Sequence, residues 1–533
     1  MKQMFKKLMS LTVVIACTAT FMVGCTDDNK EVSTQNGEKL SVSVAARVMG
    51  TGYSDMDKDA LYKEYSDKFG IALDIAELPS ETSDEKVRLL IASADVPDVM
   101  SAGFNYAEYL SYANQGLIGA LPDDYEEKYP SLAWAIKSTG LKDSLEKTND
   151  GKIYTIPRTL SIFSQETEGT KEVNIDSYGI LYRKDWADKL GIEIPMIVEY
   201  DEFIEIAKKM QNADFHNGKE IIGVSLSYDE APNLFVTACN SSYQMFHKSN
   251  GKYVYGLTED TTLEGVKMYA QAYRDGILHP NFYSHKSADA INRFLSGEAA
   301  MYFGNTCGAA TFHSNKNKFQ QANPDLDAEE ALGIFWIKSP DGKVHGRENN
   351  NYWMTWYFGP QLEGEKQHRV LSMFDYIKSK DGFKEFRLGA EGIDYKKNNG
   401  EYELLTWNAQ DNGSYTATNS YNFASLLNLM SAEEHADAPF IIYSDDTREK
   451  TSALRKAKLA EKTDLYIIDY DVRFFTGERY RNFMSQIDVN TMMAEVVVSK
   501  GDIEKEWNKK LDGIKGMLEP ALKELNENLL EDK

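Results

Sequence analysis

The residues that usually carry catalysis do not stand at any familiar catalytic spacing. The sequence contains no G-x-S-x-G, H-E-x-x-H, Walker or C-x-x-C motif, and Gly50-Thr51-Gly52 is too short for a dinucleotide loop. Its eight histidines are scattered, with no pair at metal-binding spacing on one helix. With 83 Asp and Glu residues chance pairs are expected, so a glycosidase pair stays open, because two such carboxylates need only be close in space.

Aromatic side chains point to a different chemistry. The chain has 31 Tyr, 24 Phe and 7 Trp residues. Sugars present C–H faces that pack on Trp and Tyr rings, and hydroxyl groups that pair with Asp, Asn, Arg or Glu. Most aromatics are expected in the core, and the remainder can form platforms for a carbohydrate.

The hydrophobic pattern predicts alternating strands and helices that would position these side chains. Residues 40–46 alternate apolar and polar positions and predict a first strand, residues 59–69 have helical periodicity, and residues 71–75 predict a second strand. Leu263, Val266, Tyr269 and Tyr273 then fall in register on another predicted helix. The order suits an α/β protein.

The stretch 150–210 organises this pattern. It reads as strand, crossing segment, strand, helix, loop and helix, which suits a chain that leaves one α/β lobe and enters another. The first of these strands is expected to stop at Pro157, because proline has no N–H for a ladder bond. Near the C-terminus, apolar residues from Ile503 to Leu518 predict one long amphipathic helix.

About six segments, in order, resemble the extracellular solute-binding lipoproteins of bacterial ABC importers, and the long oligosaccharide-binding branch in particular. They include "SADVPDVMSAG", "DGKIYTIP", "LYRKDWADKLGI", "FLSGEAAMYFGNT" and "NNNYWMTWYFGP". The resemblance implies a periplasmic-binding-protein-like fold, with two discontinuous α/β lobes, a hinge and an interlobe cleft. We expect residues 40–160 and 345–395 in the first lobe, and residues 161–344 and 396–533 in the second.

The same resemblance places several strand ends at the ligand cleft and so indicates which residues contact the ligand. It implies no catalytic residue. The candidate ligand contacts are Arg47, Tyr53, Phe104, Tyr106, Arg158, Tyr302, Asn305, Trp353, Trp356 and Trp407.

No metal or other cofactor is expected. Some family members carry an EF-hand-like loop after the helix that ends here near Met210. In this chain Asp214, Asn217 and Glu220 supply few oxygens, whereas calcium takes six to eight, so we interpret the loop as a turn without metal.

The first 24 residues resemble a signal peptide, with Lys2, Lys6 and Lys7 before an apolar run too short to span a bilayer. The run ends in Met22-Val23-Gly24-Cys25, which resembles a lipobox. The resemblance implies that Cys25 is diacylated and anchors the protein at the extracellular face of the cell membrane. Residues 25–39 are polar and aperiodic, and we expect a flexible tether. An ordinary signal peptide cleaved near this point is the alternative.

The net charge limits the partners. It is −24 for the chain and −27 after loss of residues 1–24, which carry three lysines and no acid. Such a chain repels nucleic acid and anionic lipid at long range. The net charge also disfavours a highly anionic substrate, although a local basic pocket could override it. The expected partners are a sugar ligand and ABC permease subunits, with the membrane touched only through the lipid anchor, and we expect a monomer.

Two cysteines remain after Cys17 leaves with the signal and Cys25 takes the lipid. We favour buried free thiols for Cys239 and Cys307, although an extracellular site would permit a disulfide between them.

Two alternative functions stay open at this stage. One is a surface-anchored carbohydrate-active enzyme, which would need two carboxylates about 5–10 Å apart across a cleft. The other is a receptor that presents its ligand to a sensor kinase rather than to a transporter. The sequence does not identify the sugar, its length or its linkage.

Overall fold

The computed structural model describes residues 38–48, 52–159, 175–216, 218–350, 352–398, 400–405, 421–431, 445–460 and 463–530. The expected signal peptide, the predicted lipidation residue Cys25, most of the expected tether and Trp407 lie outside these ranges. From Lys39 onward the described residues form one compact unit. Two separate hydrophobic cores lie within it, each around a five-stranded sheet.

The first sheet has the strand order β2-β1-β3-β13-β4. Its strands are β1 (Leu40–Arg47), β2 (Ile71–Leu78), β3 (Val99–Ala102), β4 (Thr155–Thr159) and β13 (Tyr352–Phe358). Strand β1 runs parallel to β2 and β3, whereas β13 runs antiparallel to β3 and β4. Val42 and Val44 of β1 are buried in the core. Between them, the hydroxyl and N–H of Ser43 both donate to Asp98 Oδ2.

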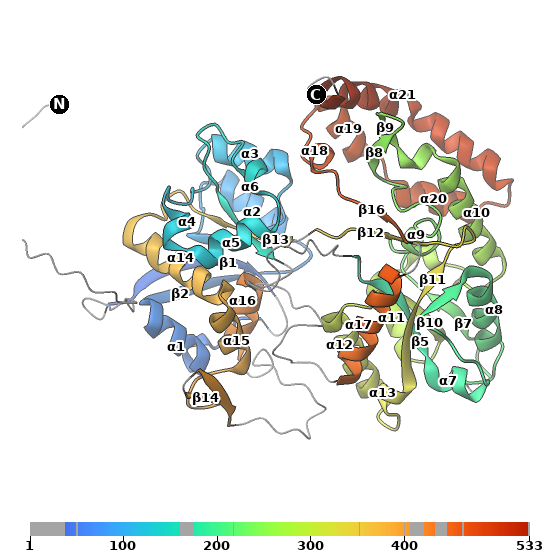
Figure 1. Ribbon diagram of the computed structural model, residues 1–533, viewed down its shortest axis with the longest axis horizontal. Coiled ribbons are helices and arrows are strands. Elements are labelled where there is room, and N and C mark those ends of the chain that lie inside the picture. The colour runs from blue at the N-terminus through green and yellow to red at the C-terminus, as the bar shows by residue number, and fades with distance from the viewer. Residues whose placement is uncertain are drawn as a thin grey trace, which may run out of the picture. The chain divides into compact units, whose positions relative to one another are not determined.

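Local signals in the sequence explain the helices on this sheet. Helix α1 (Ala60–Phe69) begins after Asp59, whose carboxylate accepts the N–H of Tyr62, and ends at Gly70, which adopts a left-handed φ of 62°. Helices α2 (Ser83–Ala92), α14 (Gly364–Lys378) and α15 (Lys380–Leu388) also contribute to this core. In Figure 1 the gold helix α14 lies in the same body as the blue strands β1 and β2, far from it in sequence.

The second sheet has the order β6-β11-β5-β10-β7. Its strands are β5 (Tyr178–Arg183), β6 (Ile197–Glu199), β7 (Ile222–Ser225), β10 (Ala299–Asn305) and β11 (Leu332–Lys338). Strand β5 is central and pairs antiparallel with both β10 and β11. The amphipathic helix α8 (Tyr200–Gln211) buries Phe203, Ile206, Ala207 and Met210 against it, which is the face that the sequence periodicity predicts.

The remaining elements connect or cover these sheets. They are α3 (Tyr106–Asn114), α4 (Tyr125–Lys128), α5 (Pro130–Ser138), α6 (Lys142–Leu145), α7 (Lys184–Lys189), α9 (Ala231–Phe235), α10 (Asp260–Arg274), α11 (Ser287–Leu295), α12 (Ala309–Ala322), α13 (Ala328–Ala331), α16 (Asn422–Met430), α17 (Asp445–Ala460), the hairpins β8 (Phe246–Ser249)–β9 (Lys252–Tyr255) and β14 (Tyr395–Asn398)–β15 (Glu401–Leu404), the parallel pair β12 (Val344–Arg347)–β16 (Thr463–Tyr466), and the 3-10 turns η1 (Met56–Lys58), η3 (Gly256–Thr258) and η4 (Phe282–Ser284).

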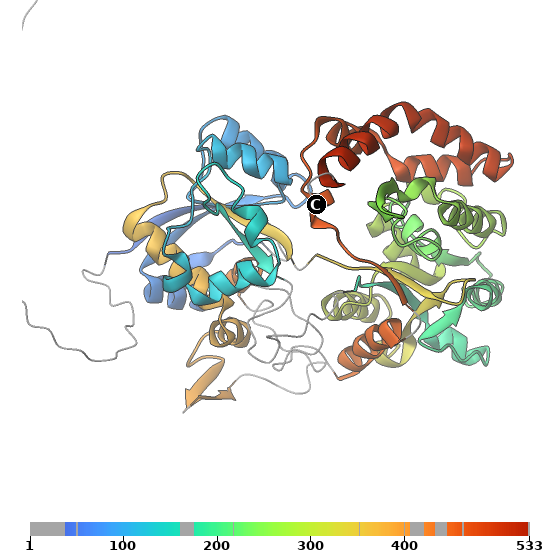
Figure 2. The same cartoon turned by 45° about the horizontal axis from the view of Figure 1, so that its top comes forward.

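A layer of C-terminal helices covers the second core. It comprises α18 (Tyr470–Arg473), α19 (Glu478–Gln486), α20 (Val489–Val497) and α21 (Ile503–Leu530). Figure 2 shows these red helices beside the green elements from the middle of the chain. Helix α21 confirms the long amphipathic helix predicted at the C-terminus and buries Trp507, Ile514 and Leu518.

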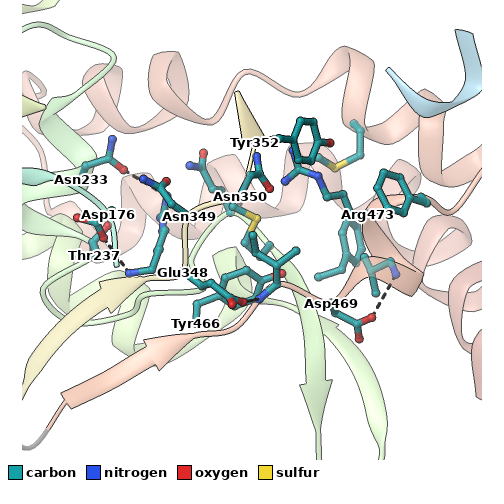
Figure 3. Close-up of a pocket in the computed structure, with 18 of the residues that line it drawn as sticks. Asp176, Asn233, Thr237, Glu348, Asn349, Asn350, Tyr352, Tyr466, Asp469 and Arg473 are labelled. Atoms are coloured by element: carbon teal, nitrogen blue, oxygen red, sulfur yellow. Dashed lines mark hydrogen bonds between the residues drawn. The ribbon is translucent and has the colours of Figure 1, made fainter. Parts of the chain in front are cut away.

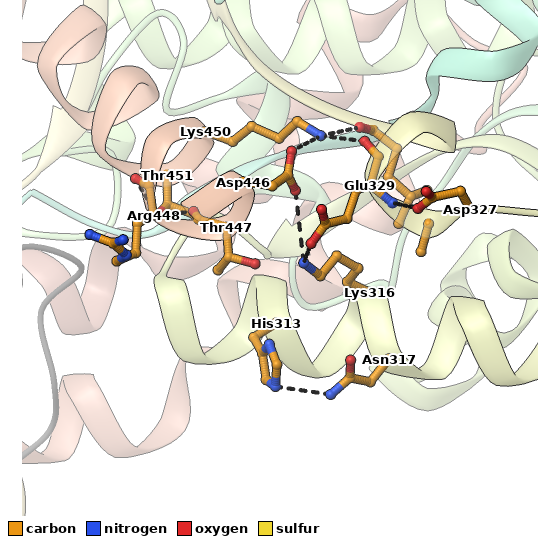
Figure 4. A network of polar contacts seen from close by, with 12 residues as sticks. His313, Lys316, Asn317, Asp327, Glu329, Asp446, Thr447, Arg448, Lys450 and Thr451 are labelled. Atoms are coloured by element: carbon orange, nitrogen blue, oxygen red, sulfur yellow. Dashed lines mark hydrogen bonds and ion pairs between the residues drawn. The ribbon is translucent and has the colours of Figure 1, made fainter. Parts of the chain in front are cut away.

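Helix α17 is fastened to the second core by ion pairs on its first turns. The Lys450 ammonium donates to Asp446 Oδ1 at 2.6 Å and to the carbonyl oxygens of Glu329 and Leu332. Lys316 of α12 pairs with the Glu329 carboxylate of α13 at 2.6 Å and lies 3.8 Å from Asp446 Oδ2 of α17 (Figure 4). These contacts hold α17 against α12, α13 and β11.

The structure differs from the sequence predictions in three places. Strand β4 continues through Pro157, because β4 is the edge strand and proline needs no ladder partner there. Helix α16 packs into the first core, although we expected everything after residue 396 in the second lobe. Strand β12 contributes Val344 to the second core and pairs with β16, so the first lobe does not resume until β13.

Cys239 and Cys307 are both free thiols, as the sequence analysis favoured. Burial raises the pKa of each thiol to about 11, which keeps both in the neutral form. Among the described residues no helix is long and apolar enough to cross a membrane.

Candidate functional site

A cavity of about 510 Å³ is the candidate site. Its walls come from the segment after β3, from β5, α9 and β11, from the chain between β12 and β13, and from the chain between β16 and α19. The lining mixes rings, amides and charges (Figure 3). The rings are Phe104, Tyr106, Tyr178, Phe246, Trp336, Tyr352, Tyr466, Phe474 and Tyr480, the amides are Asn105, Asn233, Gln244, Asn349 and Asn350, and the charged residues are Asp176, Arg347, Glu348, Asp469 and Arg473.

Asp176 anchors one wall of the cavity. Its carboxylate accepts the N–H of Arg347 at 2.8 Å and that of Tyr178 at 3.2 Å. The buried ammonium of Lys458, on α17, lies 3.1 Å from its Oδ1 and also donates to the Asp176 and Tyr178 carbonyl oxygens. The same ammonium lies 4.5 Å from the ring centre of Trp336. Asp176 is thus a structural counter-ion that joins β5, β12 and α17.

The other two carboxylates of the lining also serve the backbone. Asp469 begins α18, where its Oδ1 accepts the N–H groups of Asp471 and Val472, and its Oδ2 accepts the Tyr253 hydroxyl at 3.1 Å. Glu348 Oε2 accepts the N–H of Ile468 at 2.9 Å. Each acid of the lining is therefore already engaged by a protein donor.

Arg347 is held in place on two sides. Its Nε donates to the Ser241 carbonyl oxygen at 2.7 Å, its Nη1 donates to Asn233 Oδ1 at 3.3 Å, and its guanidinium lies 4.5 Å from the ring centre of Tyr243. Its Nη2 is buried and has no hydrogen-bond acceptor among the described residues. The pKa of Tyr243 is raised by burial, a shift that the nearby Arg347 charge partly opposes.

Three tyrosines of the lining stay protonated. Burial raises the pKa of Tyr178 and of Tyr480 to about 12, and it raises that of Tyr466 as well. Each can therefore offer a neutral hydroxyl to a ligand in addition to its ring face. Tyr106 and Phe474 meet at 4.6 Å between ring centres and close one end of this aromatic wall.

Two of the residues predicted from sequence line the cavity. Phe104 follows β3 and packs on Tyr357 with 4.7 Å between ring centres. Tyr106 begins α3 and donates its hydroxyl to the Ser144 carbonyl oxygen at 2.6 Å.

Three more predicted residues form a second group on the first sheet. Trp353 is 43% exposed, and the guanidinium carbons of Arg47 and Arg158 lie 5.6 and 5.2 Å from its ring centre. Arg47 also donates to Ser83 Oγ and pairs with Asp84. The structure therefore brings Arg47, Arg158 and Trp353 together, but none of them lines the cavity.

The other predicted contacts have packing roles or stand apart. Trp356 is fully buried against Phe374 and donates its Nε1–H to the Leu429 carbonyl oxygen at 3.1 Å, so its ring has no face for a ligand. Tyr53 and Tyr302 are buried at 4% and 6% exposure. Asn305 is exposed at the end of β10 and pairs in register with Tyr178 without itself lining the cavity.

Sequence reasoning missed most of the lining. Arg347 and Glu348 directly precede the "NNNYWMTWYFGP" segment that resembles the family, and Asn349 begins it, so their position was a usable signal. Residues 466–484 gave no such signal, because they lie outside the segments that resemble the family and show no long periodicity.

The described lining contains no histidine, cysteine or serine, and its three carboxylates hold structural hydrogen bonds. Among the described residues no group of three or more His, Cys, Asp or Glu could hold a metal ion. In the loop after α8, which stands where some family members carry an EF-hand-like loop, Asp214 Oδ1 accepts the N–H of Gly218 at 2.7 Å.

Known proteins resemble this chain in sequence and in fold. The profile of the bacterial extracellular solute-binding protein family matches residues 53–382. The Bacillus subtilis (strain 168) protein named polygalacturonan/rhamnogalacturonan-binding protein YtcQ is 25% identical over 364 residues, which span 66% of this chain and 66% of YtcQ.

Solved structures share the fold over nearly the whole chain. The S. pneumoniae ABC-transporter substrate-binding protein FusA, in complex with kestose, has a TM-score of 0.65 at 16% identity and covers 92% of this chain and 99% of its own. The alginate-binding protein AlgQ2 has a TM-score of 0.61 at 18% identity, with 93% and 99% covered. These likenesses confirm the predicted α/β fold with two sheet-containing lobes.

Proposed function

Since the chain belongs to the bacterial extracellular solute-binding protein family, we propose that it captures an oligosaccharide and delivers it to the permease subunits of an ABC importer. The observation that carries this proposal is the cavity, whose lining combines aromatic rings with neutral amide and hydroxyl groups. Sugars need this combination, because their C–H faces pack on aromatic rings while their hydroxyls both donate and accept hydrogen bonds.

The named relatives support a saccharide as the ligand class. YtcQ is named for binding polygalacturonan and rhamnogalacturonan, and FusA was solved with kestose. Both are binding proteins, which agrees with the structural engagement of every carboxylate in the cavity lining. The enzyme alternative is thereby disfavoured at the level of the family.

A lipid anchor completes the proposal. Cys25 would carry the lipid, so that the protein acts at the extracellular face of the membrane as a monomer. Cys25→Ala should release the protein into the medium or leave it unprocessed. Membrane association of this variant that still requires detergent would argue against the anchor.

Ligand capture would work by lobe closure. A saccharide that touches both lobes favours the closed arrangement over the open one. Phe104 and Tyr106 would contribute from the first lobe, and Tyr178 with Asn233 from the second. Small-angle scattering should show compaction when the ligand is added.

The central experiment is isothermal titration calorimetry against a panel of oligosaccharides. Tyr178→Ala should weaken binding of the ligand so found by about 30- to 1000-fold, since a lost ring face removes about 2–4 kcal/mol of stacking and burial. Tyr283→Ala is the matched control, because Tyr283 is 48% exposed and lies outside the cavity.

Two results would contradict the proposal. One is equal binding by the Tyr178→Ala and Tyr283→Ala variants. The other is recovery of the saccharide in cleaved form, because a transport protein leaves its ligand intact.

A further inference from the structure

Two arginines face the cavity of a chain whose net charge is −24. Arg347 lies at the end of β12 and Arg473 at the end of α18. At the same cavity, Lys458 forms an ion pair with Asp176. The two cavity arginines have no ion pair with any carboxylate among the described residues.

The acids of the lining are committed elsewhere. Lys458 compensates Asp176 at 3.1 Å, Asp469 caps α18, and Glu348 accepts the N–H of Ile468. These contacts occupy the carboxylate oxygens with donors other than the two guanidinium groups. The guanidinium groups of the two arginines therefore make none of the hydrogen bonds that hold these carboxylates in place.

Donors in the cavity wall lack acceptors. Arg347 Nη2 and Trp336 Nε1 are both buried without a hydrogen-bond partner among the described residues. A buried donor without a partner costs about 1–3 kcal/mol and requires an explanation. Arg473 is exposed, and its side chain makes no hydrogen bond within the described part of the chain.

The two guanidinium groups act on the same region of the cavity. Both arginines line the cavity together with Tyr466. The charge of each also partly opposes the burial that raises the pKa of Tyr466. Figure 3 shows Arg473 and Tyr352 on the same side of the cavity, with Tyr466 and Asp469 below them.

We propose that the saccharide carries carboxylates and that Arg347 and Arg473 bind them, so that the ligand is an oligosaccharide containing uronic acid. A guanidinium offers a planar pair of donors that matches a carboxylate, and charged hydrogen bonds of this kind are about twice as strong as neutral ones. The basic pair also overcomes the repulsion that the acidic protein exerts on an anion at long range. This inference rests on the proposed function, because it names the class of sugar that the same cavity takes.

The experiment compares matched ligands that differ only in charge. The probes are trimers of galacturonate, glucuronate, mannuronate and guluronate, the methyl ester of each, and neutral trisaccharides of the corresponding hexoses. Calorimetry with the full-length mature protein should find at least one uronate trimer that binds about 30-fold or more tightly than its methyl ester, because an unpaired buried donor or charge is costly. The affinity for that trimer should fall when the salt concentration rises from 50 to 200 mM.

Variants then locate the effect. Arg473→Met should weaken binding of the uronate trimer about 30-fold or more and bring it close to that of the methyl ester. Arg479→Met removes the same charge from α19 outside the cavity, and it should leave the affinity unchanged. Arg347→Met tests the second guanidinium, with circular dichroism as the check that this partly buried site still folds.

The outcomes separate the inference from the function on which it rests. The carboxylate inference is overturned if neutral trisaccharides or methyl esters bind as tightly as the acids. It is also overturned if the Arg473→Met and Arg479→Met variants have the same affinity for the uronate trimer. In both cases saccharide binding stands. If neither the acids nor the neutral sugars bind, both the inference and the proposed function fail.

Discussion

Replacement of Lys458 by methionine should destabilise the second core more than any loss of a surface ion pair. The Lys458 side chain is 2% exposed and the Asp176 side chain 7% exposed, and Lys458 Nζ lies 3.1 Å from Asp176 Oδ1. Methionine keeps the length of the side chain but leaves Asp176 charged and without its cation. Two carbonyl oxygens, those of Asp176 and Tyr178, also lose a donor.

The expected cost is about 3–5 kcal/mol of unfolding free energy, which is the usual result of breaking a buried ion pair on one side. Lys458→Met combined with Asp176→Asn should recover about 1 kcal/mol or more of that loss, because the double variant buries no unpaired charge. The pair Lys184–Asp188 supplies the control: it is also close, at 2.6 Å, but its side chains are 39% and 56% exposed. Lys184→Met should therefore cost only about 0.3–0.5 kcal/mol.

Urea unfolding followed by circular dichroism measures these differences. A lower midpoint with an unchanged slope would assign the effect to stability, since the slope reports the surface exposed on unfolding. The reasoning is refuted if Lys458→Met and Lys184→Met lower the unfolding free energy by amounts that differ by less than about 0.5 kcal/mol. It is also refuted if the Lys458→Met, Asp176→Asn double variant is less stable than Lys458→Met alone.

Three further predictions concern stability. Burial and the neighbouring Lys316 lower the pKa of His313 to about 4. The contribution of neutral His313 to stability is therefore complete above pH 6.5 and is lost as the pH falls toward 4. His313→Gln should make the melting temperature depend less on pH across that range. Gly265→Ala should destabilise the protein, because the new Cβ would lie 2.6 Å from Val236 Cα. In Gly516→Ala, by contrast, the new Cβ in α21 meets no atom within 4 Å, and thermal unfolding should show a gain of up to about 1 kcal/mol in unfolding free energy. Trp356→Ala should cost about 3–5 kcal/mol in urea unfolding while the folded fraction keeps its ligand affinity, and a variant that folds normally but loses its ligand would show that the ring contacts the saccharide.

The sequence predicted the elements better than it predicted the cavity. Strands and helices with long periodic patterns, such as β1, α1, α8 and α21, lie where apolar spacing indicates, because each buries one face against a sheet or core. The segment from β16 to α18 has only four-residue elements. Its place at the cavity depends on pairing with β12, more than a hundred residues earlier, which local pattern cannot reveal.

Trp356 illustrates the same limit for single residues. Alternation along β13 puts Tyr352 and Trp356 on one face of the strand in a regular register, but the strand is irregular between Tyr352 and Thr355. Tyr352 lines the cavity, whereas Trp356 is covered by α14 and α16. Helix α16 could not be placed from sequence, because its neutral apolar run fits either core equally well.

The position of β13 between β3 and β4 has a consequence for biosynthesis. Strand β4 (Thr155–Thr159) hydrogen-bonds to no strand of its sheet other than β13 among the described residues, and β13 (Tyr352–Phe358) leaves the ribosome almost two hundred residues later. A nascent chain that ends before β13 thus holds two unpaired strand edges, on β3 and β4, which are sites for aggregation. The chain must be kept unfolded, or bound by a chaperone, until both halves of the first sheet have been synthesised.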